Sequence, residues 1–93
     1  MHVERAEFEF VDRDALPQWT MRVRITGQGL EEGARPIMAR VGSQRVQSII
    51  SLVEGEGIQG FLEEEPATGD ELSIGYADEP LIETGITYDP AIV

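Results

Sequence analysis

The chain has no cysteine and no lysine, and its single histidine is His2. Without cysteine, neither a disulfide framework nor a thiolate metal site can form. One histidine beside a chain end does not support a Ser-His-Asp arrangement or a histidine-based metal site. No apolar run approaches the ~20 residues of a membrane span, and the N-terminus lacks the basic-then-apolar order of a signal peptide. We therefore expect no cofactor, no membrane insertion and, if the chain is complete, a cytoplasmic location.

Positive charge is missing from the second half of the chain. Residues 1–45 hold seven acidic and seven basic residues, whereas residues 46–93 hold eleven acidic residues and no basic one, so the formal charge is −11. Repulsion from phosphates argues against nucleic acid and anionic membranes as partners. The two halves of separate copies can attract each other head to tail, which predicts self-association that salt weakens. An acidic chain without lysine also suits a high-salt habitat or GC-rich coding DNA.

Helical periodicity is hard to find, whereas apolar and polar residues alternate in short segments separated by turn residues. Such alternation, with turns every eight to twelve residues, is typical of a β-sandwich or a β-barrel. The length fits one domain over residues 1–93. The sequence predicts an all-β, immunoglobulin-like sandwich of about seven antiparallel strands, with a small barrel as the alternative. The predicted strands are residues 5–11, 19–26, 37–41, 45–53, 58–63, 72–76 and 82–88.

Three local features refine this prediction. Leu30 follows a glycine turn and is expected to fold back onto the core. The even spacing of apolar residues slips between Val46 and Ile49, which predicts a bulge near residues 47–48. Trp19 shares the parity of the inward residues of the strand 19–26, so it is expected in the core, with Tyr76 and Tyr88 packed nearby. No exposed aromatic row of the kind that binds sugars is then expected.

Four glycine-containing segments follow one another along the chain: 23–30 (VRITGQGL), 41–46 (VGSQRV), 66–74 (PATGDELSI) and 85–88 (GITY). Their order resembles the IPT/TIG family of immunoglobulin-like domains over residues 19–88. The resemblance implies a binding or spacer module of the kind found in surface receptors, polysaccharide-acting enzymes and some transcription factors. The resemblance assigns no functional residue to this chain, because these domains share a fold and not a common binding site. The chain departs from the family where a proline and a glycine pair usually precede the second strand, and in its acidic C-terminal part.

Residues 55–60 match the glycine spacing of a dinucleotide fingerprint, G-x-G-x-x-G. That motif needs a helix immediately after the glycines to hold a pyrophosphate. Pro66 and Gly69 leave no room for such a helix, and Glu54 and Glu56 would repel phosphate. The segment is therefore interpreted as a turn and a strand.

Two groups of charged residues form the candidate interaction surface. Arg22 and Arg24 point outward from their predicted strand, where they can grip an acidic ligand or pair with Glu7 and Glu9 of a neighbouring strand. The run Glu63, Glu64 and Glu65 is expected at a strand end in solvent, where it discourages edge-to-edge association. Paired carboxylates can also serve a glycosidase, but nothing in the sequence suggests a cleft for one.

Asp12 and Asp14 lie in one predicted loop and are candidate ligands of a calcium ion. Calcium takes six to eight oxygens, so other loops would have to contribute. Asp89 is the third candidate, and Asp78 or Glu79 could join if their loops reach the same end of the domain. A solvated, aspartate-rich turn explains the same residues.

The sequence therefore favours a non-enzymatic structural or protein-interaction module of unknown specific role, which recognises a protein or its own copy through a sheet edge or loop tips. The alternative is a carbohydrate- or calcium-binding accessory domain of a larger enzyme or surface protein. An enzyme is disfavoured because the chain lacks a nucleophile–base pair, a usable histidine and a cofactor motif.

Overall fold

The computed structural model describes residues 2–30, 36–52 and 57–92, which form eight strands and one short 3-10 helix. The all-β prediction is confirmed, with one strand more than expected. The predicted strand 45–53 is divided in two because the chain leaves one sheet and joins the other. The elements are β1 (His2–Phe10), β2 (Met21–Gln28), β3 (Ile37–Val41), β4 (Gln44–Arg45), β5 (Gln47–Ser51), β6 (Gly57–Leu62), β7 (Glu71–Tyr76), β8 (Ile82–Thr87) and η1 (Pro90–Ile92).

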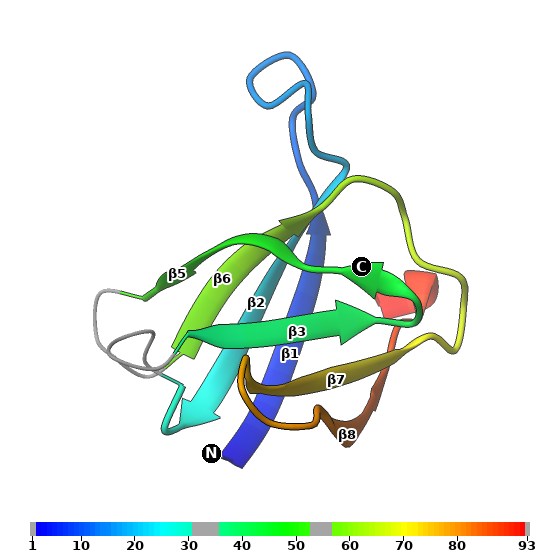
Figure 1. The fold of residues 1–93 in the computed structure, drawn as a ribbon. Helices are drawn as coiled ribbons and strands as arrows, with labels where there is room; N and C mark the ends of the chain where they lie inside the picture. Colours follow the sequence, from blue (N-terminus) through cyan, green and yellow to red (C-terminus); the bar gives the residue numbers. More distant parts are fainter. Residues whose placement is uncertain (1, 31–35, 53–56, 93) are drawn as a thin grey trace.

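The strands form two antiparallel four-stranded sheets, drawn as two layers in Figure 1. The first sheet has the order β1-β2-β6-β5 and the second has the order β4-β3-β7-β8. Named by sequence, these are the A-B-E-D and C′-C-F-G orders of an immunoglobulin-like sandwich. Two separate sheets settle the choice between sandwich and barrel in favour of the sandwich. The loop between β1 and β2 projects beyond both layers (Figure 1).

The core is built from the inward side chains of both sheets, since successive residues of a strand point to opposite faces. Met21, Val23 and Ile25 of β2 are fully or almost fully buried, as the alternation predicted. Leu30 is also buried and lies in the core as expected. Full burial of one such side chain contributes about 1.5–3 kcal/mol. The other buried apolar residues are Ile37, Ala39, Val41, Val46, Ile58, Leu62, Leu72, Ile74 and Tyr88.

The chain crosses from the second sheet to the first at Val46. The Val46 amide donates to the Ala39 carbonyl (2.9 Å), and the next residue already pairs in the first sheet. Gly60 lies beneath this crossing, where a Cβ atom would approach Val46 Cγ1 to 2.4 Å. The predicted bulge follows at once: the β5–β6 register shifts between Gln47 and Ile50, and Ser48 has a φ of 54°. The slip in the apolar spacing thus marked a change of sheet.

All four sheet edges are short or irregular. The register of β1 shifts between Val3 and Arg5, and β5 carries the bulge at Ser48. In β8, the three residues 84–86 lie opposite one residue of β7. The remaining edge strand, β4, has only two residues. Bulges and short edge strands discourage the addition of a further strand.

In the described ranges, the structure has no helix that is long and apolar enough to cross a membrane.

Candidate interaction face

The strand register places eight outward side chains in two rows across the first sheet. Because Val23, Ile58 and Leu62 point into the core, the residues next to them in β2 and β6 point toward solvent. We call this surface the outer face of the first sheet. The first row is Glu9, Arg22, Phe61 and Gln47, and the second is Glu7, Arg24, Gln59 and Ile50.

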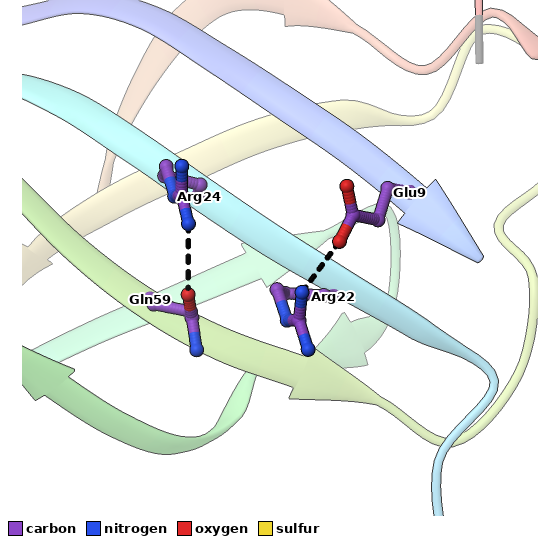
Figure 2. A network of polar contacts seen from close by, with 4 residues as sticks. All are labelled: Glu9, Arg22, Arg24 and Gln59. Carbon is purple, nitrogen blue, oxygen red and sulfur yellow. Dashed lines mark hydrogen bonds and ion pairs between the residues drawn. The ribbon is translucent and has the colours of Figure 1, made fainter. Parts of the chain in front are cut away.

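The two arginines of the outer face have fixed partners, shown in Figure 2. Arg22 Nη1 donates to Glu9 Oε1 across the β1–β2 pair, which confirms the predicted cross-strand ion pair. Arg24 Nη2 instead reaches Gln59 Oε1 at 3.5 Å (Figure 2). Glu7, the residue opposite Arg24, forms an ion pair with Arg5 at 3.0 Å. The arginine stripe therefore belongs to a network that spans three strands.

Two aromatic rings lie on this face, contrary to the sequence prediction. Trp19 stacks on the outward Phe61, with ring centroids 5.5 Å apart and an angle of 20° between the planes. The guanidinium carbon of Arg22 lies 5.8 Å from the centroid of Phe61. Cation–π contacts of this length contribute about 0.5–1 kcal/mol at exposed sites. Trp19, Phe61 and Arg22 thus form an aromatic–cation cluster.

The prediction that Trp19 lies in the core is wrong. β2 begins only at Met21, so strand parity does not extend back to Trp19. The preceding residues form a turn in which the Trp19 amide donates to the Leu16 carbonyl (3.1 Å). Thr20 then ties the chain to the end of β6, because its amide donates to the Leu62 carbonyl at 2.9 Å. Trp19 is half-buried on the outer face as a result.

A shallow hollow of about 250 Å³ lies beside the cluster, lined by residues of β1 and β2 that include Glu9, Arg22 and Arg24. The Arg22 Nε atom is buried and has no hydrogen-bond partner in the part of the chain that the structure describes. The face therefore combines aromatic surface, amide groups and guanidinium donors, the groups that bind polar acceptors of a partner.

The acidic run Glu63–Glu65 follows β6 and has a fixed backbone. The Gln44 side chain donates to the Glu64 carbonyl and accepts from the Glu64 amide, both at 2.9 Å. Thr20 Oγ1 donates to the Glu63 carbonyl at 2.7 Å. All three glutamates are exposed, as predicted. They differ in role, however, because Glu65 Oε2 accepts a hydrogen bond of 2.6 Å from the Tyr88 hydroxyl.

Tyr88 is buried after β8, where it contacts Phe8 of β1 and Glu65. Its ring is 1% exposed and packs edge-on against Phe8, with centroids 5.2 Å apart. Burial, followed by the hydrogen bond and charge of Glu65 and the charge of Asp89, raises the pKa of Tyr88 to about 12. Tyr88 lies in the core as expected, but its aromatic partner is Phe8 and not Trp19.

Two of the candidate calcium ligands, Asp12 and Asp89, accept hydrogen bonds from backbone amides of their own loops. Asp12 Oδ1 accepts from the Asp14 amide at 2.9 Å. Asp89 Oδ1 accepts from the Ala91 amide at 2.9 Å, at the start of η1. In residues 2–30, 36–52 and 57–92, no three His, Cys, Asp or Glu side chains are grouped as a metal site would require. A calcium site at these residues stays a prediction without a ligand cluster to support it.

The glycine-spaced segment 55–60 is partly visible. Gly55 lies outside the described residues, whereas Gly57 and Gly60 belong to β6. A strand at this position is what the sequence interpretation required, and a strand does not offer the helix N-terminus that binds a pyrophosphate.

No family model, curated protein or solved structure matches this chain at a significant level. The IPT/TIG resemblance therefore stays a prediction.

Proposed function

We propose that this chain is a non-enzymatic protein-interaction module that binds its partner through the outer face of the first sheet. The observation that carries the proposal is the cluster of Trp19, Phe61 and Arg22 on a solvent-facing sheet. Tryptophan and arginine are enriched among the residues that dominate binding energy at protein interfaces. Because Glu9 and Phe61 hold Arg22 in place, little side-chain entropy is lost when a partner binds.

The irregular edges support a face rather than an edge as the recognition surface. Addition of a partner strand needs a regular row of free backbone groups. Shifts in register interrupt β1, β5 and β8, and β4 is too short to offer such a row. The strand order is also compatible with an IPT/TIG-like binding or spacer module, which forms part of this proposal.

The proposal is tested by Arg24→Glu against Arg13→Glu, an identical charge change at an exposed arginine in the β1–β2 loop. Proteins that the immobilised chain captures from an extract of the cells that encode it are identified and purified. Each is then titrated calorimetrically against the unchanged chain, R24E and R13E. We expect R24E to weaken binding about tenfold or more, and R13E to leave the dissociation constant within about twofold. If every captured protein binds R24E as well as it binds the unchanged chain, the outer face is not the recognition surface.

The second candidate function is carbohydrate binding, which the aromatic pair on the outer face now favours. Trp19 and Phe61 present apolar rings beside the amide groups of Gln47 and Gln59 on the same face. Aromatic rings combined with a few polar groups suit a neutral sugar. Trp19 is the only tryptophan, so its emission reports directly on this face.

Titration with neutral oligosaccharides of glucose, xylose and mannose separates the two functions. Glycan binding requires a saturable change in Trp19 emission that Gln59→Ala weakens. A protein-interaction module leaves the emission unchanged with all three sugars.

A further inference from the structure

The outer face of the second sheet carries two arginines that form no ion pair with any described residue. Arg40 of β3 and Arg45 of β4 are direct cross-strand neighbours, and both are exposed. Like charges placed opposite each other destabilise a sheet. Neither arginine forms an ion pair with any residue of the described ranges. The register continues the row through Ser73 to Glu83, so the only acid in the row is two strands away from Arg40.

The acidic run of the same molecule lies close to this hairpin, but it is on the wrong side for Arg45. Gln44 precedes Arg45 in β4, and its amide group grips the backbone of Glu64. Successive side chains of a strand point to opposite faces, so Arg45 does not lie on the side of β4 from which Gln44 contacts Glu64. The charges of one molecule are thus held near each other without meeting.

The acidic run has the complementary form. Glu63 and Glu64 are exposed, and their backbone is fixed by Thr20 and Gln44. Beside them lies an open hollow of about 400 Å³ between the β3–β4 turn and the start of the β6–β7 loop. Glutamates on a fixed backbone lose less freedom when they bind a guanidinium group, and arginine binds carboxylates with two parallel hydrogen bonds.

We propose that a second copy of this chain supplies the missing partners, with Arg40 and Arg45 of each copy meeting Glu63 and Glu64 of the other. The contact is reciprocal, as a two-fold dimer requires. The contact joins Arg40 and Arg45 of the second sheet to the acidic run that follows β6, and none of these residues belongs to the two rows of the outer face of the first sheet. Physiological ionic strength screens the repulsion of two acidic molecules beyond ~8 Å and leaves contacting ion pairs in place. Molar salt, with a screening length of ~3 Å, dissociates the dimer.

The test is a reciprocal charge reversal, read by sedimentation equilibrium from about 10 μM to about 1 mM protein. R40E/R45E and E63R/E64R each place like charges at the contact, so we expect each variant alone to remain monomeric. An equimolar mixture restores both contacts with opposite charges, and the mass returns toward the dimer. The E63R/E64R result is the sharper one, because this variant carries less net negative charge and would associate more readily if overall repulsion decided the outcome.

The matched control is R5E/R13E, which makes the same change in net charge at two exposed arginines outside the proposed contact. It should dimerise as the unchanged chain does, and circular dichroism checks that every variant is folded. The proposal is overturned if the unchanged chain stays monomeric over the whole concentration range. It is equally overturned if R40E/R45E dimerises alone or if the mixture of reversed variants does not associate.

Discussion

The two sheets use arginine in opposite ways on their outer faces. On the first sheet, Arg22 lies between Glu9 and Phe61, and Arg24 reaches Gln59. On the second sheet, Arg40 and Arg45 lie opposite each other, and neither forms an ion pair with any described residue. The four side chains are chemically identical and all lie on strands. What differs is the residue that the register places opposite each one, and that difference separates arginines with partners on their own sheet from arginines without an ion pair among the described residues.

This difference predicts two kinds of recognition. The first sheet presents aromatic surface beside arginines that already contact Glu9 and Gln59, so binding there should depend less on salt. The second sheet presents bare charge, so binding there should be strongly salt-dependent. The two proposals together assign a second copy to Arg40, Arg45 and the acidic run, and a different partner to the outer face of the first sheet.

The largest expected effect concerns the hydrogen bond from the buried Tyr88 to Glu65, the exposed last residue of the acidic run. Tyr88 has its pKa raised from 10.0 to about 12. Between these values the unfolded chain has lost the tyrosine proton and the folded chain keeps it, so the free energy of unfolding falls as pH rises. The expected loss is about 1.4 kcal/mol per pH unit, or about 2–3 kcal/mol in total, and the contribution is fully present below pH 10.

Urea unfolding between pH 9 and pH 12 measures this loss, and Tyr88→Phe should remove it. The chain has no lysine and no cysteine, so the side chains with reference pKa values in this range are tyrosines alone. Glu65→Gln should lower the pKa of Tyr88, which ultraviolet absorbance of tyrosinate records. If Tyr88 ionises near pH 10 in the folded chain, burial and Glu65 do not raise its pKa, and the pH-dependent loss of stability is absent.

The next effect tests the aromatic cluster of the first sheet. Phe61→Ala removes the ring that stacks on Trp19 and lies beside Arg22. We expect a loss of about 1–2 kcal/mol of stability and a shift of Trp19 emission to longer wavelength, because one face of the indole becomes solvated. Ile50→Ala, at a 56% exposed position in the neighbouring row, is the control and should leave the emission unchanged. Equal spectra for both variants would mean that Trp19 does not depend on Phe61.

The sequence predicted the parts of this fold that rest on strand parity. In β2, apolar and charged residues alternate without interruption from Met21 to Ile25, and one face of that strand is buried throughout. The same parity correctly placed Arg22 and Glu9 on one face. Where one side of a regular strand is buried, a shift by one residue would expose its whole apolar set, so the pattern specifies the register.

The features that sequence reasoning missed depend on where parity stops. Trp19 keeps the spacing of the inward residues, but a turn precedes Met21 and rotates the indole onto the outer face. Val46 ends the pairing of β4 and turns the chain to the other sheet over Gly60, which a reading of residues 45–53 as one strand cannot show. The Arg40–Arg45 pair was equally hidden, because only the hairpin register brings these residues together.

The smallest effect compares the two kinds of arginine directly. Arg22→Gln and Arg40→Gln remove one charge each and keep most of the stem. R22Q loses an ion pair and a cation–π contact and should lower stability by about 0.5–1 kcal/mol. R40Q relieves a like-charge pair and should raise stability by a few tenths of a kcal/mol, roughly 0.2–0.5.

Urea unfolding at about 1 μM protein measures both changes, because the chain does not associate at this concentration. Both differences should shrink in about 1 M salt, because the two effects are largely electrostatic. Equal losses for both variants would show that Arg40 already has a partner within the folded molecule, and the second sheet would then have no need of a second copy.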